Sequence, residues 1–295
     1  PDYWPLSYTA LWAAWRLFGA HPAGYHALSI ALHAASALLL WRLLRALGLP
    51  WAALAGALFA VHPAGAESVA WISEIKNTLS GVLWLATFLA WGPAAPRPPW
   101  RRALALALFA LALLAKVSVA PLPAVLVGIA IARRGRLERR DLADALPFAA
   151  LALAAGVMNV SYQHGHALAG FSAPPSLAAR IGGAGWALAT YLVTAYAPVR
   201  LAVVYPPWPR APGDPLFWAP LAALALAAAL LWRLRRTPGG RAALLASGYH
   251  LACVAPVLGL VDMAYFAVGP VSNHLQHLAL MGPPALAAWA LARAA

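Results

Sequence analysis

The chain has 295 residues, of which 63% are hydrophobic and only 10% are charged, and its formal net charge is +13. Soluble domains carry about 25% charged residues, so the composition excludes an ordinary soluble fold. In a membrane protein an excess of arginine is typical of cytoplasmic loops, so the positive charge does not indicate nucleic-acid binding. The composition predicts an all-α polytopic membrane protein.

Apolar stretches that could enter a bilayer follow one another along the chain. A span needs roughly 20 apolar residues, and fewer where the bilayer thins or the helix is re-entrant. We expect a bundle of about nine membrane helices with short external helices and loops, in a single domain over residues 1–295. The predicted spans are residues 24–47, 49–62, 77–92, 101–115, 119–133, 142–160, 215–233, 242–260 and 279–293.

Basic clusters assign the two sides of the membrane, because cytoplasmic loops carry the excess of arginine. The clusters fall at alternate ends of the predicted spans, and they are Arg42 with Arg45, Arg97 with Arg101 and Arg102, residues 133–140, residues 233–241, and Arg293. The opposite side then holds both lysines, Lys76 and Lys116, and the acids Asp2, Glu67, Glu74, Asp214 and Asp262. The rare polar chemistry is therefore expected on the non-cytoplasmic face.

Residues 161–214 break the alternation of sides. Their apolar stretch, residues 181–197, is flanked by external segments at both ends. We expect one large external loop over 161–214, with a helix that dips into the membrane or lies at its interface. An inverted orientation somewhere upstream is the alternative.

The segment HPAGAESVAWISEIKNTLSG, residues 62–81, gathers scarce charges and contains no helix breaker between Glu67 and Gly81. One face of a continuous helix would carry Glu67, Trp71, Glu74 and Thr78. Burial would raise the pKa of Glu67, which suits a general base. The simpler alternatives are that Glu67 complements the helix dipole and that Glu74 faces water.

Lys116 interrupts an apolar run just before Pro121 and Pro123. A lysine near the membrane interior is by default a functional candidate, and its natural partner is an anion such as a lipid phosphate. Snorkelling of the side chain to the head groups is an equally good explanation.

Two further groups of residues are candidates for substrate contacts. Asn273, His274 and Gln276 form a polar patch before the last predicted span. Tyr3, Trp4 and Trp71 lie at interface depth, where an aromatic belt explains them, although such rings also stack on sugars.

Six motifs follow one another along the chain: PDYWPLSYTALWAAWRLFG, GYHALSIALHAASALLLWRLLRALG, HPAGAESVAWISEIKNTLSG, AKVSVAPLP, PVRLAVVYPPWP and VSNHLQHLALMG. This order resembles the bacterial relatives of the transmembrane and tetratricopeptide-repeat O-mannosyltransferases, which belong to the GT-C class of multi-span glycosyltransferases. The likeness runs from residue 1 to about residue 282, and the third motif is its most specific part.

The resemblance implies an integral-membrane enzyme of the bacterial inner membrane. Such an enzyme moves a sugar from a polyprenyl-phosphate carrier to a protein Ser/Thr or glycan acceptor on the periplasmic or extracellular face. It implies catalytic roles for Glu67 and His62, and donor-phosphate binding by Lys76, Lys116 and Arg200. Substrate contacts would come from Tyr3, Trp4, Trp71, Glu74, Asn77, Asn273, His274 and Gln276. The sequence has no convincing cluster of metal ligands, and the need for a divalent metal stays open.

The chain also departs from that pattern. It begins after the point where the family carries an acidic pair, so the first span and the first acidic loop are expected to be missing. Relatives usually carry Asp and Tyr where this chain has Asn273 and His277, and the tetratricopeptide repeats are absent. The alternative function is a non-catalytic polytopic membrane protein: a lipid-linked sugar carrier, a scaffold or a diverged pseudoenzyme. A carrier would show polar residues near the middle of several spans.

Overall fold

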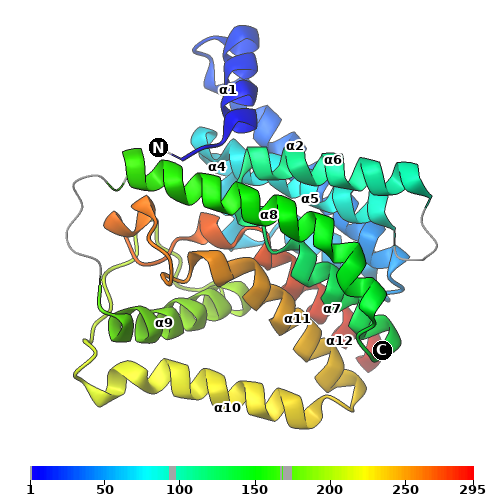
Figure 1. Ribbon diagram of the computed structural model, residues 1–295, viewed down its shortest axis with the longest axis vertical. Coiled ribbons are helices and arrows are strands. Elements are labelled where there is room, and N and C mark those ends of the chain that lie inside the picture. The colour runs from blue at the N-terminus through cyan, green and yellow to red at the C-terminus, as the bar shows by residue number, and fades with distance from the viewer. Residues whose placement is uncertain (1, 93–97, 167, 169–174) are drawn as a thin grey trace.

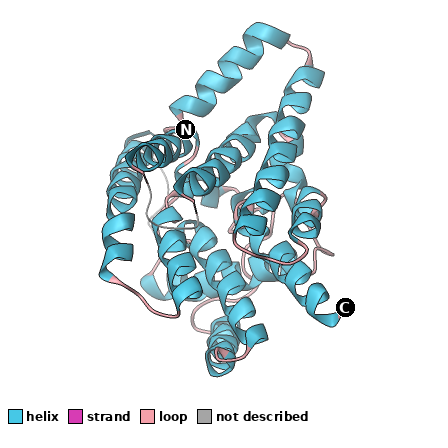
Figure 2. Cartoon of the chain, turned by 90° about the vertical axis from the view of Figure 1, so that its right-hand side faces the viewer, coloured by secondary structure: helices cyan, strands magenta, loops and turns pink. Residues whose placement is uncertain are grey.

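The computed structural model describes residues 2–92, 98–166, 168 and 175–295. The regular elements within these residues are helices, and no strand occurs among them (Figure 1, Figure 2). The helix α1 (Pro5–Phe18) projects from the bundle that the other helices form. The described residues confirm the predicted all-α fold. Arg97, which belongs to one of the predicted basic clusters, lies outside the described residues.

The centre of the bundle is formed by α2 (Pro22–Ala46), α5 (Ile75–Trp91) and α6 (Pro99–Ala115), which pack against one another in that order. Aromatic side chains fill the interior: the rings of Trp84 and Phe88 on α5 are 5.3 Å apart and both are buried. Offset and edge contacts of this kind add to the energy of apolar burial.

Segments far apart in the sequence close the bundle. The short helix α3 (Ala52–Ala60) packs against both α2 and α12 (Gly282–Ala294). The helix α11 (Pro238–Val254) packs against α12 and α7 (Leu122–Arg134), and α7 packs against α8 (Arg139–His166). The first and last parts of the chain therefore share one core.

Glycines allow a close approach between α9 (Leu177–Tyr196) and the segment that leads into α10 (Ala219–Leu234). A Cβ atom on Gly182 would lie 2.1 Å from the ring of Phe217, so a larger side chain would push the two segments apart. The helix α9 falls within the predicted external loop. Its depth in the membrane stays a prediction.

Four described helical segments are long and apolar enough to cross a membrane: Pro22–Ala46, Val117–Arg134, Arg139–His166 and Pro215–Leu234. The helix α10 has no buried residue, and it leaves Leu226 and Leu230 exposed. A helix that is apolar all round and unburied suits contact with lipid. The structure therefore indicates a membrane protein.

The predicted count of nine spans is not confirmed. The helices α5, α6 and α11 have 17 residues each, which is about 25 Å at a rise of about 1.5 Å per residue, against a hydrocarbon thickness of about 30 Å. The segment 49–62 gives only the 9-residue α3, because the chain turns through a 3-10 helix after His62. That segment is therefore not confirmed as a crossing helix.

Arginines of the predicted basic clusters gather at one end of the helices. Arg133, Arg241 and Arg293 line one cavity between α2, α5, α7, α11 and α12. A neighbouring cavity is lined by Gly92 at the end of α5 and by charged residues of both signs: Arg133, Arg134, Arg140, Asp141 and Asp144. The chain's C-terminus lies at this arginine-rich end, on the right of Figure 1, and the chain begins on the opposite side.

Candidate functional site

The segment 62–81 is not one continuous helix, and the prediction that Glu67 and Glu74 share one helical face is wrong. The helix α4 (Ala66–Ala70) ends at Trp71, whose backbone is extended with φ −85° and ψ 121°. A 3-10 turn, η2 (Ile72–Glu74), follows before α5 begins. The break directs the two carboxylates to different partners.

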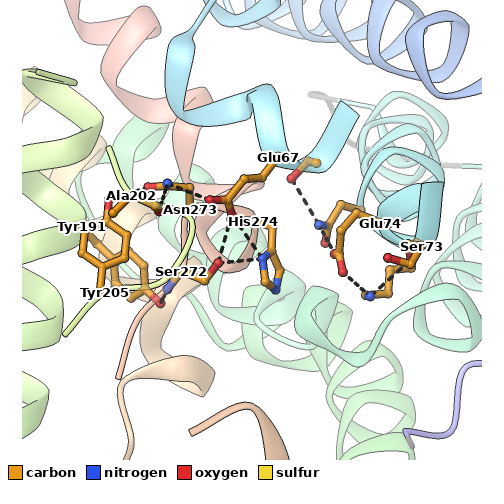
Figure 3. A network of polar contacts seen from close by, with 12 residues as sticks. Glu67, Ser73, Glu74, Tyr191, Ala202, Tyr205, Ser272, Asn273 and His274 are labelled. Carbon is orange, nitrogen blue, oxygen red and sulfur yellow. Dashed lines mark hydrogen bonds and ion pairs between the residues drawn. The ribbon is translucent and has the colours of Figure 1, made fainter. Parts of the chain in front are cut away.

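Glu67 binds the segment that precedes α12. Its Oε2 accepts hydrogen bonds from Ser272 Oγ at 3.0 Å and from the backbone N–H of His274 at 3.1 Å, and it lies 3.3 Å from His274 Nδ1. Its Oε1 accepts a hydrogen bond from Asn273 Nδ2 at 3.0 Å (Figure 3). One carboxylate thus fixes three consecutive residues that lie about two hundred positions later in the chain.

The loop before α10 joins this group through Asn273. The Tyr205 hydroxyl donates to Asn273 Oδ1 at 2.9 Å, and Asn273 Nδ2 also donates to the carbonyl of Ala202 at 3.0 Å. The hydroxyl of Tyr191 accepts a hydrogen bond from the Ser272 N–H at 3.4 Å (Figure 3). The motifs at 197–209 and 271–282 therefore meet at Glu67.

Glu74 belongs to a second, adjacent group that contains both lysines of the chain. Its carboxylate pairs with Lys76, and its Oε2 accepts a hydrogen bond from Asn77 Nδ2 at 2.7 Å. The Nδ2 of Asn77 also donates to Ser68 Oγ at 3.1 Å, and the Oδ1 of Asn77 accepts a hydrogen bond from Lys116. Glu74, Asn77 and Lys116 are at most 5% exposed. We call Glu74, Lys76, Asn77 and Lys116 the lysine cluster.

The N-terminal motif packs beside the lysine cluster. The Nζ of Lys76 lies 4.7 Å from the centre of the Trp4 ring, which is a cation–π distance. Gln163 donates a hydrogen bond to Asp2, and the backbone N–H of Tyr3 donates to Asn159 Oδ1 at 3.4 Å. The end of α8 therefore holds the start of the chain against the two lysines.

Two aromatic rings pack against His274 of the Glu67 group. The His274 ring lies 5.8 Å from the Trp71 ring and 5.2 Å from the Tyr265 ring. Trp71 is 37% exposed, so it offers a free aromatic surface next to a buried polar network. Such surfaces suit stacking contacts with a sugar ring.

Three predicted site residues are not among the described hydrogen-bond partners of Glu67 or of the lysine cluster. His62 has both ring nitrogens engaged, because Nδ1 accepts a hydrogen bond from the Ala64 N–H at 3.3 Å and Nε2 lies 3.0 Å from the Ala195 carbonyl. It is not among the hydrogen-bond partners of Glu67. Gln276 donates to Thr194 Oγ1 at 2.8 Å, and Arg200 is exposed outside both polar groups. These contacts give His62 and Gln276 structural roles in fixing α9.

The charges at the site differ from the expectation for Glu67. Burial alone would raise the pKa of Glu67, but hydrogen bonds from His274, Asn273 and Ser272 outweigh it and hold this pKa below its ordinary value. The pKa of Glu74 is also lowered, since Lys116 and Lys76 overcome the effect of its burial. The prediction of a raised pKa at Glu67 is wrong, because the residue is surrounded by donors.

Two other groups at the site have pKa values shifted by burial. Burial raises the pKa of Asp2 above its ordinary value, against the hydrogen bond from Gln163 and the charges of the two lysines. Burial lowers the pKa of Lys116 to about 8, although the nearby Glu74 carboxylate favours the charged ammonium. Of the acids Asp2, Glu67 and Glu74, Asp2 is the one whose affinity for a proton is increased.

Sequence reasoning missed several partners at the site. Ser272 directly precedes Asn273 in the motif VSNHLQHLALMG, but nothing in the sequence marks it as a partner of Glu67. Ser68 and Gln163 had no signal at all, because one is a small residue in a helix and the other lies in an apolar helix. Spacing along the chain does not reveal a partner that only the tertiary fold brings near.

The described residues include no group of three or more His, Cys, Asp or Glu side chains that could hold a metal ion. The need for a divalent metal stays open. Comparisons with known proteins leave the family open as well: no family model, no curated protein and no solved structure matches this chain.

Proposed function

We propose that this chain is a multi-pass inner-membrane glycosyltransferase of the GT-C type, which takes a sugar from a polyprenyl-phosphate carrier. The acceptor would be a protein Ser/Thr side chain or a glycan on the non-cytoplasmic face. The observation that carries the proposal is the lysine cluster: two lysines, one of them buried, gathered beside Trp4 and Asp2 at one end of an apolar bundle.

The lysine cluster suits the binding of a phosphate that arrives on a lipid. Lys116 is nearly fully buried, and its ammonium reaches the neutral amide of Asn77. Glu74 balances one of the two positive charges, so the cluster has an excess of one positive charge. A buried positive charge in a site of low dielectric constant stabilises a leaving phosphate more strongly than an exposed one.

The transfer step assigns different roles to the acids. The acceptor oxygen bonds to the anomeric carbon, the carbon–oxygen bond to the carrier phosphate breaks, and the phosphate leaves with the electron pair. The acceptor's proton must pass to a base. Asp2 suits this role better than Glu67, because burial raises the pKa of Asp2 whereas hydrogen-bond donors lower that of Glu67. Glu67 then acts as a positioning residue that holds residues 272–274.

The distribution of charge supports the proposed orientation. Arg133, Arg241 and Arg293 lie at one end of the helices, and such residues favour the cytoplasm. The helix α5 begins at the lysine cluster and ends beside that arginine-rich end, and α6 returns to Lys116. This arrangement supports a site that opens toward the periplasm or the cell exterior.

A transfer assay tests the proposal. The purified protein is reconstituted in vesicles, and transfer is measured from a panel of radiolabelled polyprenyl-phosphate sugars to Ser/Thr peptides and glycans. We expect transfer by the wild type and its loss in Lys116→Met, while Arg236→Met, which removes one positive charge from an exposed site after α10, transfers normally. Equal transfer by wild type and Lys116→Met would refute the role of the cluster.

One observation favours the alternative of a protein that binds carrier lipid without turnover. Both oxygens of Glu67 are occupied by internal hydrogen bonds, as in a purely structural carboxylate. A non-catalytic protein would bind a polyprenyl phosphate through Lys76 and Lys116 and transfer no sugar from any donor in the panel. Binding and transfer measured on one preparation distinguish the two functions.

A further inference from the structure

The larger of the two cavities at the arginine-rich end of the bundle suggests a binding site. It has a volume of about 740 Å³ and lies between α2, α5, α7, α11 and α12. Its walls are mostly aliphatic and aromatic, with Leu44, Trp84 and Ile129 among the side chains that line it. It belongs to neither of the two polar groups at the other end of the same helices.

Positively charged side chains line one part of this cavity. Arg133, Arg241 and Arg293 come from three different helices or helix ends and line it together, and none of the described residues that line it is acidic. Arg293 also lies 5.9 Å from the ring centre of Trp289, another lining residue. The cavity therefore joins an apolar volume to guanidinium groups.

Glycines keep part of the cavity open. Gly128 on α7 and Gly248 on α11 both line it, and a Cβ atom built on either would meet no heavy atom within 4 Å. Protein interiors are close-packed, so an apolar cavity of this size between helices has room for a ligand or a lipid chain.

We infer that this cavity binds an anionic phospholipid of the membrane leaflet at the arginine-rich end, with an acyl chain along Trp84 and Leu245 and the headgroup phosphate at Arg241 and Arg293. Basic pockets between membrane helices bind anionic lipid headgroups through this combination of an apolar groove and arginines. The arginine fork can pair with two phosphate oxygens of either kind of headgroup. A zwitterionic headgroup adds a quaternary ammonium that the arginines repel and that no acidic residue among the described lining residues balances, which favours an anionic headgroup.

The site is distinct from the proposed donor site. The helix α5 contributes Asn77 to the lysine cluster at its start and Trp84, Leu85 and Phe88 to the cavity farther along. One helix therefore contacts both places, and a lipid that packs on its second half would brace the helix that carries Asn77. The lipid is expected to stabilise the fold rather than to react.

The test counts bound lipid on the detergent-purified protein by native mass spectrometry, with dioleoyl phosphatidylglycerol and dioleoyl phosphatidylcholine as probes. The wild type is expected to retain one phosphatidylglycerol at a concentration at which phosphatidylcholine is not retained. In the double variant Arg241→Gln/Arg293→Gln the affinity for phosphatidylglycerol is expected to fall about thirtyfold, as for the loss of two charge contacts.

One control tests whether the effect depends on the position of the removed charge. A second control tests whether it depends on filling the cavity rather than on a general loss of folding. Arg235→Gln/Arg236→Gln removes the same charge after α10 without touching the cavity, and it is expected to bind as the wild type does. Gly128→Leu fills the cavity and is expected to weaken binding of phosphatidylglycerol. Gly156→Leu on α8, where an added Cβ also meets nothing, should leave binding unchanged.

Three results would overturn the inference: equal retention of the two lipids by the wild type, unchanged phosphatidylglycerol binding in Arg241→Gln/Arg293→Gln, or a loss of the same size in the Arg235→Gln/Arg236→Gln control. A polyprenyl phosphate that loses affinity in Arg241→Gln/Arg293→Gln while phosphatidylglycerol does not would also overturn it. The experiment measures bound lipid and not sugar transfer. The inference can therefore be tested even if the protein transfers no sugar.

Discussion

The ammonium of Lys116 donates a hydrogen bond to the amide oxygen of Asn77, 39 residues earlier in the chain. The amide nitrogen of the same Asn77 donates to Glu74, so one side chain links the buried lysine to its balancing carboxylate. Asn77 stands at the start of α5 and Lys116 at the end of α6. This hydrogen bond joins the start of α5 to the end of α6, away from the arginine-rich end.

Asn77→Ala should destabilise the protein more than a comparable change elsewhere. It removes hydrogen bonds to Glu74, Ser68 and Lys116, and buried groups left without partners cost about 1–3 kcal/mol each. We expect a loss of about 3 kcal/mol in the free energy of unfolding, measured by denaturation in mild detergent. Asn159→Ala on α8 is the control, since its described hydrogen bond is a single 3.4 Å contact with Tyr3. Equal losses of stability in the two variants would contradict the role of Asn77 as the link between Glu74, Ser68 and Lys116.

Glu67→Gln should alter how stability depends on acid. The pKa of Glu67 in the folded protein lies below its value in the unfolded chain, so its contribution to stability is present above about pH 4.5 and is lost as the pH falls through the folded value. The variant is expected to be less stable at pH 7, by about 2 kcal/mol, and to lose less stability between pH 7 and acid than the wild type. If the free energies of unfolding of the two proteins change in parallel with pH, the hydrogen-bond donors do not lower the pKa of Glu67.

Lys116 should make the binding of a polyprenyl phosphate depend on pH. Burial lowers its pKa to about 8, so the ammonium loses its proton as the pH rises through 8. We expect affinity for the carrier phosphate to fall above pH 8 in the wild type. Lys116→Arg keeps its charge throughout this range and should remove that fall. An identical pH profile for the two proteins would exclude Lys116 as the titrating group.

Asp2→Asn should affect the chemical step more than binding. The asparagine oxygen can still accept the hydrogen bond from Gln163, but the side chain no longer takes a proton. Because a general base contributes about 100-fold or more, we expect kcat for sugar transfer to fall by at least that factor, with little change in KM. A rise in KM as large as the fall in kcat would show that Asp2 only positions its neighbours.

Hydrophobic pattern predicted much of the fold. The predicted spans 77–92 and 101–115 differ from α5 and α6 by at most two residues at each end, because Gly92 and the prolines before α6 mark the boundaries. The break at Trp71 could not be predicted in the same way. No proline or glycine lies between Glu67 and Glu74, so the extended backbone at Trp71 follows from the tertiary contacts of the two carboxylates.

The candidate site was partly predictable for a similar reason. Glu67, Glu74, Lys76 and Lys116 stand out because charged residues are rare in this chain. Their partners do not stand out, since Ser272 lies 205 residues from Glu67 and Gln163 lies 161 residues from Asp2. The pKa of Glu67 depends on those partners, so burial alone predicted its direction wrongly.

The central claim is that the lysine cluster and the arginine-rich end face opposite sides of the membrane, with the cluster outside. Cysteine labelling in intact cells tests it with a membrane-impermeant maleimide, because the native Cys253 is buried and gives little background. Ser73→Cys, at an exposed residue beside Glu74, should be labelled in intact cells, and Arg136→Cys, at an exposed residue of the arginine-rich end, only after permeabilisation. Labelling of Ser73→Cys only after permeabilisation would contradict the account.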